Sequence, residues 1–352
     1  MRQIKINNLF NNLIMSEENA GRRYFWEVEE DPAPGYEEIE REVSEEDSSE
    51  ADTMFTVKTA DQWTDEALMR ETPEPLWKNL WHEGEVACLF ADSNVGKSIY
   101  AVQIGSHIAQ RKRVLYFDFE LSDKQFQMRY TTPDNRKVTF GKNFLRCEID
   151  PDLIGEGSIE DSIIRDIERV ALQYKSRILI IDNITYLSGV TESPDCASRL
   201  MLNLMRLKKK YGLSILVLAH TPKRNMTSPL TQNDLAGSKK LYNFFDSVFA
   251  IGKSAKDGNI RYVKQLKVRA CECTYGADNV LLNEIGYNGS FLSFIENGTG
   301  KEAEHLKTAG EETENRNRMR VLSLREEGKS IREIADALGL SRSKVGRIAS
   351  SI

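Results

Sequence analysis

Short apolar runs alternate with longer amphipathic segments over the middle of the chain. The runs contain few polar residues, which is typical of strands that are buried on both faces. Strands are therefore expected at 85–90, 114–119, 178–181 and 214–219. The other segments carry apolar residues at helical spacing, and helices are expected at 61–69, 97–110, 122–130, 159–174 and 197–211. This alternation predicts an α/β fold in which helices cover both faces of a mostly parallel sheet.

The pattern changes after residue 246, where apolar runs follow one another without helices between them. These runs predict strands at 248–251, 261–268, 280–284 and 291–295. Asp257-Gly258 and Asn288-Gly289 stand at hairpin positions, because Asp-Gly and Asn-Gly favour tight turns between strands. We expect an antiparallel extension that completes the sheet.

The N-terminal part of the chain is strongly acidic. Residues 27–52 contain thirteen acidic residues and one basic residue, Arg41, whereas the net charge of the whole chain is −6. Residues 16–51 lack an apolar period long enough to pack, so we expect the N-terminal segment 1–53 to be largely disordered. The acidic run is either a solvating tail or an arm that mimics nucleic acid and inhibits the protein.

The composition is that of a globular protein of about two domains, with 352 residues of which 40% are hydrophobic. The chain has no run of about 18 apolar residues and no signal-peptide pattern, so we expect a cytoplasmic protein with no membrane partner. Its five cysteines lack paired C-x-x-C spacing, which argues against a disulfide framework or a zinc site.

The segment EVACLFADSNVGKS joins an apolar strand to a helix through a turn that ends in Gly96-Lys97-Ser98. Backbone N–H groups of such a turn converge on one anion, which predicts a phosphate-binding loop for a nucleotide. Lys97 would reach the β- and γ-phosphates, and the Ser98 hydroxyl would hold Mg²⁺. Ala91 replaces the first glycine of G-x-x-x-x-G-K-[ST], so an ordinary strand-turn-helix is the alternative. The nucleotide-binding residues are expected to be Ser93, Asn94, Val95, Gly96, Lys97, Ser98 and Ile99.

Two further strands end in acidic residues at the carboxyl edge of the predicted sheet, where open α/β sheets bind ligands. Asp182 closes the run RILIID and would hold Mg²⁺ together with Ser98. Glu120 closes VLYFDFE, and its carboxylate would orient and deprotonate the water that attacks the γ-phosphate. Alternatively, Glu120 is an acid that stabilises the N-terminus of the next helix.

The phosphate loop, FDFELSDKQ, ILIIDN and LVLAHT occur in the order found in RecA-type ATPases. Over roughly residues 77–296 the chain resembles the RepA-like and DnaB-like branch of hexameric helicases. The resemblance implies a RecA-like P-loop core that binds ATP and Mg²⁺. It also implies that Glu120 is the catalytic base, Asp182 the metal partner and His220 the sensor of the γ-phosphate.

The run QLKVR matches the Lys-x-Arg signature of the same family. The resemblance implies that Lys267 and Arg269 enter the nucleotide site of a neighbouring subunit and stabilise charge in the transition state. An exposed pair of basic strand residues is the alternative. The segment DLAGSKK looks like the family's loop that faces single-stranded DNA in the ring channel, which would give Lys239 and Lys240 phosphate contacts. A solvated basic turn is the alternative here.

The C-terminal residues predict three short helices, at 316–327, 331–338 and 341–352. Gly339 gives a tight turn after the second helix and Ser341 can cap the third, which is helix-turn-helix spacing. IREIADALGLSRSKVGRIA resembles resolvase-like and sigma-like DNA-binding helices. The residues expected to contact DNA are Arg342, Ser343, Lys344 and Arg347. A three-helix module that docks protein is the alternative.

These features divide the chain into an acidic segment (1–53), a RecA-like ATPase domain (54–296), a linker (297–314) and an all-α helix-turn-helix domain (315–352). We expect a homo-oligomer, with a hexamer favoured, that hydrolyses ATP on DNA as a helicase of plasmid or mobile-element replication. An ATP-gated DNA-binding regulator that never unwinds DNA is the alternative. A structural protein whose altered loop no longer binds nucleotide is a further one.

Overall fold

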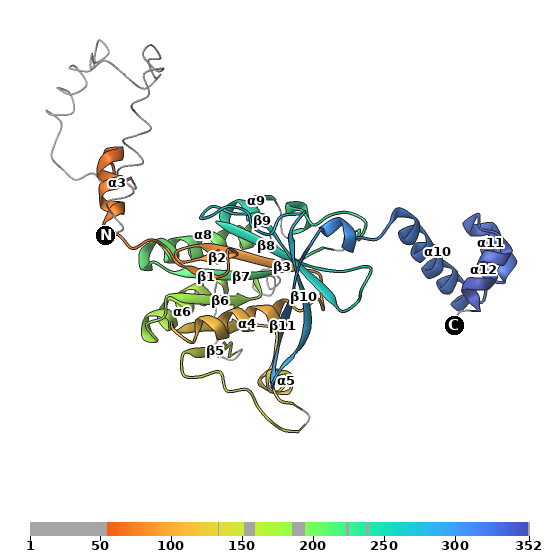
Figure 1. Ribbon diagram of the computed structural model, residues 1–352, viewed down its shortest axis with the longest axis horizontal. Helices are drawn as coiled ribbons and strands as arrows, with labels where there is room; N and C mark the ends of the chain where they lie inside the picture. The colour runs from red at the N-terminus through yellow and green to blue at the C-terminus, as the bar shows by residue number, and fades with distance from the viewer. Residues whose placement is uncertain are drawn as a thin grey trace, which may run out of the picture. The chain divides into compact units, whose positions relative to one another are not determined.

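The computed structural model describes residues 55–132, 134–150, 159–184, 194–222, 225–236 and 239–350 (Figure 1). The chain has two compact units, 1–71 and 72–352. The described part of the first unit contains helix α3 (Ala60–Leu68), which Thr59 caps by accepting a hydrogen bond from the N–H of Gln62. The helix expected at 61–69 is therefore present, whereas the disorder expected for 1–53 lies outside the described residues.

A nine-stranded sheet forms the centre of the second unit, in the order β11-β10-β9-β8-β3-β7-β6-β4-β5. The strands from β8 to β5 are parallel, and β9, β10 and β11 continue the sheet in antiparallel fashion. The parallel strands are β3 (Val86–Ala91), β4 (Val114–Asp118), β5 (Phe144–Glu148), β6 (Ile178–Asp182), β7 (Ser214–His220) and β8 (Ser247–Lys253). The antiparallel strands are β9 (Ile260–Lys267), β10 (Val280–Asn288) and β11 (Phe291–Gly300). This arrangement confirms the predicted fold class.

Helices cover both faces of the sheet and create two apolar layers. The helices are α4 (Lys97–Ile108), α5 (Asp123–Arg129), α6 (Ile159–Gln173), α8 (Pro194–Tyr211) and α9 (Lys239–Phe244). Successive side chains of β3 alternate between the layers, so that Cys88 packs in the layer under α6 and α8 while Leu89 packs in the layer under α4. No helix in the described part of the chain is long and apolar enough to span a membrane.

The β10–β11 hairpin runs past α4 and is joined to it by a pair of hydrogen bonds (Figure 1). The Gln103 side chain donates to the Phe294 carbonyl at 3.0 Å and accepts from the Phe294 N–H at 2.8 Å. On the same face, β1 (Pro75–Trp77) pairs with β2 (Trp81–His82), and the buried Trp77 donates to the Tyr100 hydroxyl at 2.9 Å. The β1–β2 hairpin therefore packs in the α4 layer.

Two segments differ from the sequence-based expectation. Strand β5 was not predicted, because FLRCE is short and carries Arg146 and Glu148, as a strand at the end of the sheet can. Strand β11 continues to Gly300 instead of ending at 295, a 3₁₀ helix η4 (Glu302–His305) follows, and α10 (Ala309–Glu326) begins earlier than 316. Much of the segment expected to be a linker is thus regular structure, since β10 offers strand partners as far as Val280.

The C-terminal helices have the predicted cap and turn residues. Helix α11 (Ile331–Leu338) ends at Gly339, whose φ of 63° is left-handed, and α12 (Arg342–Ala349) begins after Ser341, which accepts a hydrogen bond from the Lys344 N–H. Val321, Ile334 and Val345 bring α10, α11 and α12 together around a small apolar core. The described residues thus form the predicted helix-turn-helix.

The turn glycine supports a stability prediction. Gly339→Ala should destabilise the α11–α12 unit by about 1 kcal/mol, because a Cβ at a left-handed position strains the backbone although no atom lies within 4 Å of it. Hydrogen exchange of the α11 and α12 amides in the full chain measures the change.

Gly346 is the matched control, since it lies within α12 and a Cβ there also meets nothing within 4 Å. Gly346→Ala should stabilise α12 by roughly 0.5–1 kcal/mol, because alanine favours a helix more than glycine does. Its amides should therefore exchange more slowly. Equal effects of the two substitutions would contradict the assigned turn geometry.

Candidate functional site

The predicted phosphate loop joins β3 to α4 and adopts a backbone that few residues tolerate. Asn94 and Gly96 both have left-handed φ values, 60° and 108°. A Cβ on Gly96 would lie 2.7 Å from Cδ1 of Ile285, on β10. Glycine at this position is thus required by its φ and by the packed hairpin beside it. The loop leads into the N-terminus of α4, where free backbone N–H groups can bind an anion.

Ala91, the departure from the glycine pattern, is the last residue of β3 and is still part of the sheet. It pairs with His220 of β7 on one side and Ile251 of β8 on the other. Its φ is not among the left-handed ones, so the Cβ costs no backbone strain. This strand geometry is compatible with alanine, and the loop begins only after it.

Lys97 is buried beneath the loop, with 6% of its surface exposed. Its ammonium donates to the carbonyls of Ala91 at 3.0 Å and Asp92 at 3.4 Å, and lies 3.1 Å from Nδ1 of His220. Burial lowers the pKa of Lys97, while the carboxylates of Asp182, Glu120 and Asp92 act in the opposite direction. The three N–H bonds of the ammonium are all used within the protein.

A row of side chains connects Lys97 to the predicted base. His220 Nε2 lies 3.0 Å from Nδ2 of Asn183, and the same amide donates to Oε2 of Glu120 at 2.9 Å. Burial and the Lys97 charge lower the pKa of His220, which favours the neutral imidazole. The structure thus brings Lys97, His220 and Glu120 together at the carboxyl edge, with Asn183 as a member that the sequence analysis missed.

Asp182 lies fully buried at the end of β6. Tyr116 donates to its Oδ2 at 2.5 Å, whereas Oδ1 has no hydrogen-bond partner among the described residues. Burial raises the pKa of Asp182 to about 6, and the Tyr116 and Ser98 hydroxyls act in the opposite direction. A buried carboxylate oxygen without a partner, near the Ser98 hydroxyl, fits a site for Mg²⁺.

The described residues contain no cluster of three or more His, Cys, Asp or Glu side chains that could hold a metal. This is compatible with Mg²⁺, which proteins commonly bind through one or two side chains together with substrate phosphates. Asp182 and Ser98 are the residues that would hold it.

Glu120 is held in position by a neighbour that the sequence analysis also missed. Oδ1 of the buried Asp118 accepts hydrogen bonds from the N–H groups of Glu120 at 3.2 Å and Leu121 at 2.9 Å. Its Oδ2 accepts from Nε of Arg146 at 2.8 Å. Helix α5 is capped by Ser122, so Glu120 is not the cap of that helix and its side chain contacts Asn183 instead.

Lys267 and Arg269 lie at the opposite end of the sheet from the phosphate loop. Lys267 pairs with Val248 near the start of β8, and Val248 pairs with Cys88 near the start of β3. Lys267 donates to the carbonyl of Tyr242 at 3.2 Å, and Arg269 donates to Oδ1 of Asp246 at 2.8 Å. The structure does not bring these two side chains to the nucleotide site of their own chain.

The structure describes the side chains of some, but not all, of the residues predicted to contact DNA. Lys239 and Lys240 begin α9, but their side chains lie outside the described part of the chain. On α12, Arg342, Ser343 and Arg347 are exposed and Lys344 is partly exposed. These four residues are therefore available to a ligand.

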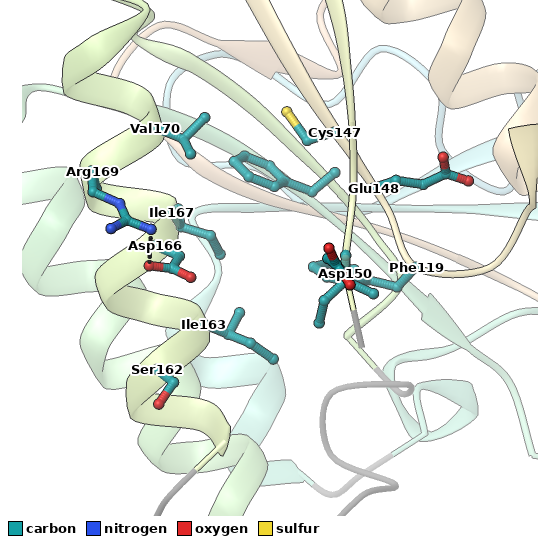
Figure 2. A pocket seen from close by; sticks show the side chains of 12 residues that line it. Phe119, Cys147, Glu148, Asp150, Ser162, Ile163, Asp166, Ile167, Arg169 and Val170 are labelled. Carbon is teal, nitrogen blue, oxygen red and sulfur yellow. Dashed lines mark ion pairs between the residues drawn. The ribbon is translucent and has the colours of Figure 1, made fainter. Parts of the chain in front are cut away.

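A pocket of about 220 Å³ lies between α6 and the end of β4 and β5 (Figure 2). Its wall is mainly apolar, with Phe119, Ile163, Ile167 and Val170 facing it. It is separate from the predicted nucleotide site, because neither Lys97 nor the phosphate loop lines it.

The pKa of Asp182 leads to a pH prediction for protein free of nucleotide and metal. Its pKa is raised from 3.8 to about 6, so the folded state binds a proton more tightly than the unfolded state. The free energy of unfolding should therefore fall by about 2 kcal/mol as pH rises from about 4 to about 7. Asp182→Asn should lack this component, which denaturant titrations of both proteins across this range measure. Parallel stability curves for the two proteins would contradict the raised pKa of this buried carboxylate.

Comparison with known proteins agrees with this geometry. A family model described as an AAA domain matches residues 51–226, which is half of the chain and includes the phosphate loop, Glu120, Asp182 and His220. A model described as a homeodomain-like domain matches residues 313–350. The DNA repair protein RadA of Pseudomonas aeruginosa is 26% identical over 216 residues, 59% of this chain and 39% of RadA, so the chain spans about two fifths of that relative's length. The chain belongs to the AAA domain family of P-loop ATPases and carries a C-terminal homeodomain-like helix-turn-helix.

Proposed function

We propose that this protein is a DNA-acting ATPase motor that assembles into a ring, as a helicase of plasmid or mobile-element replication. The observation that carries the proposal is the row of adjacent polar side chains from Lys97 through His220 and Asn183 to Glu120 at the carboxyl edge of the sheet. Hydrolysis needs a cation at the phosphates and a carboxylate at the attacking water, and this row holds both groups in one network. The name of the relative RadA, a DNA repair protein, also favours a role on DNA.

Each group has a distinct part in the proposed reaction. Lys97 and the loop N–H groups bind the β- and γ-phosphates, and Glu120 accepts a proton from the attacking water. Bound Mg²⁺, held through Ser98 and Asp182, would neutralise charge on the phosphate oxygens. His220 contacts Lys97 and, through Asn183, Glu120, so it is suited to sense whether a γ-phosphate is present.

The location of Lys267 and Arg269 supports assembly. They lie at the amino ends of β3 and β8, away from the phosphate loop of their own chain. A role in hydrolysis therefore requires a second copy, whose nucleotide site meets this end of the sheet. Head-to-tail contacts of this kind close into rings when the rotation permits, and a hexamer is the proposed size.

A mixing experiment tests the shared site. Glu120→Gln and Arg269→Ala should each bind ATP but lose turnover by at least about 100-fold. When the two inactive proteins are mixed in equal amounts, about a quarter of the interfaces combine an intact Glu120 with an intact Arg269, and turnover should recover to that extent. Steady-state hydrolysis of the mixture is the measurement, and Lys97→Ala replaces Glu120→Gln in a parallel mixture that should also recover.

No recovery in either mixture would mean that Arg269 does not act between subunits. Retained turnover in Glu120→Gln alone would remove that residue as the base. The two failures are distinct, because the first leaves the base assignment intact.

Asp118 and Arg146 give a second prediction, on kcat. Asp118→Asn should lower kcat by about 10- to 100-fold with little change in ATP affinity, because Glu120 is no longer held by a charged acceptor that Arg146 fixes. Arg146→Lys should lower kcat less than Arg146→Met, since lysine keeps the charge but not the fork geometry. Parallel losses of ATP affinity and kcat would indicate a general loss of structure instead.

An ATP-gated DNA-binding regulator that does not unwind is the second candidate. It is favoured by the well-capped α11–α12 pair, whose exposed Arg342 and Arg347 suit duplex DNA. Strand displacement on a forked duplex, measured beside hydrolysis with and without single-stranded DNA, separates the candidates. A motor unwinds the fork and is stimulated by single strands, whereas a regulator binds duplex without either effect.

A further inference from the structure

Residues 301–307, between β11 and α10, are bonded to the ATPase core although the sequence pattern predicts a linker there. We call them the connecting segment. The Glu302 N–H donates to the carbonyl of Ala277 at 2.8 Å, and the His305 carbonyl accepts from the N–H of Ala255 at 2.8 Å. His305 also lies 3.0 Å from the Ser254 hydroxyl through its Nδ1. The segment is therefore bonded to the loop between β8 and β9 and to the loop between β9 and β10.

The connecting segment also contacts the loop that follows β7. The described parts of this loop are 221–222 and 225–236, and its far end returns to the predicted nucleotide site, where the Ala236 N–H donates to the carbonyl of His220 at 2.9 Å. The Lys307 N–H donates to the carbonyl of Met226 at 3.1 Å. Helix α10 begins two residues later, at Ala309. The loop is thus hydrogen-bonded to His220 at one end and to Lys307, two residues before the first helix of the helix-turn-helix domain, at the other.

Glu302 is the centre of this contact. It is 1% exposed, and its Oε1 accepts from the Leu230 N–H at 2.7 Å. Its Oε2 accepts from the ammonium of buried Lys264 at 2.5 Å, and that ammonium also donates to the Leu230 carbonyl at 2.8 Å. The pair therefore satisfies both backbone groups of one loop residue. A buried ion pair is costly to form, and its best-attested use is to fix one arrangement of the groups around it.

Nucleotide binding should disturb this arrangement at its other end. The Lys97 ammonium uses its three N–H bonds on Ala91, Asp92 and His220, so a phosphate can gain a bond to it only if one of these is given up. His220 is the only side chain among the three. It also ends β7, so a change in its hydrogen bonds acts directly on the loop that begins at the next residue.

We propose that Glu302 and Lys264 couple the nucleotide site to the helix-turn-helix domain, so that the affinity of this domain for duplex DNA depends on the nucleotide bound. The inference rests on the proposed function, because it takes ATP as the ligand of the loop and DNA as the ligand of α12. The loop and the connecting segment are the element that both ligands bias, which is what coupling between two sites requires.

The test compares duplex binding by two matched double variants of the full chain. In Lys264→Met with Glu302→Leu, apolar side chains of similar size replace the buried pair, a change that folded proteins often tolerate. The control is Lys78→Met with Glu296→Leu, which removes a Lys–Glu pair of the same 2.5 Å length that joins the β1–β2 turn to β11 and is much less buried. Anisotropy of a fluorescein-labelled duplex of mixed sequence gives Kd with Mg²⁺ and either ADP or a non-hydrolysable ATP analogue.

In the wild type and the control, Kd should differ between the two nucleotides by about 5- to 150-fold, the usual range of coupling between sites. In the Lys264/Glu302 variant the ratio should fall to about 1, while nucleotide affinity stays within about twofold of wild type. Duplex DNA should also change analogue affinity in the wild type by the same factor, because coupling is reciprocal. A ratio of 1 in wild type, or a preserved ratio in the Lys264/Glu302 variant, overturns the proposal.

Hydrogen exchange keeps the test separate from the proposed function. Exchange of the Glu302 and Lys307 amides should differ between the ADP and analogue complexes of wild type, but not of the Lys264/Glu302 variant. This readout needs no DNA, so an absent difference in nucleotide-bound wild type overturns the coupling even if no duplex is bound. Failure to bind nucleotide at all would instead contradict the proposed function.

Discussion

An ammonium group buried at the end of an apolar sheet must have its hydrogen bonds satisfied, and the site is organised around this requirement. Lys97 is buried away from bulk water, so its charge is stabilised by nearby carbonyls, by His220 and by the carboxylates beyond them. In the proposed function, the same burial would strengthen the attraction of this group for a polyphosphate, because charges interact more strongly where water is excluded. The carboxyl ends of neighbouring parallel strands supply these partners from widely separated parts of the sequence.

The backbone of the site was predictable because it follows from long apolar runs and a short glycine motif. Strands buried on both faces leave a clear pattern of apolar residues, and it led to Asp182, which ends β6, and to Glu120, which lies two residues beyond the end of β4. The phosphate loop was found through Gly96, Lys97 and Ser98. Ala91 departs from the glycine motif in sequence, but in the structure it is the last residue of β3, where alanine fits the backbone.

The partners of these residues were not predictable in the same way. Asp118 is one of two acids in FDFE, and only the fold shows that it holds backbone N–H groups while Glu120 points to Asn183. Arg146 lies on β5, whose mixed polar and apolar residues carry no clear period. The connecting segment looked like a linker because it is mostly polar, and its buried residue Glu302 is held by pairing with Lys264 of β9 rather than by hydrophobicity. Long-range pairing of this kind has no local signature.

The packing of Gly96 against Ile285 bears on what constitutes a folding unit in this protein. The family match ends at residue 226, yet β3 lies between β7 and β8, and β8 and the β10–β11 hairpin all come after that point. A fragment that ended at residue 226 would lack β8, so β3 would become an edge strand. The turn at Gly96 would also lose Ile285, against which it packs. The half of the chain that identifies the family is thus not self-sufficient, and the C-terminal strands complete the catalytic domain.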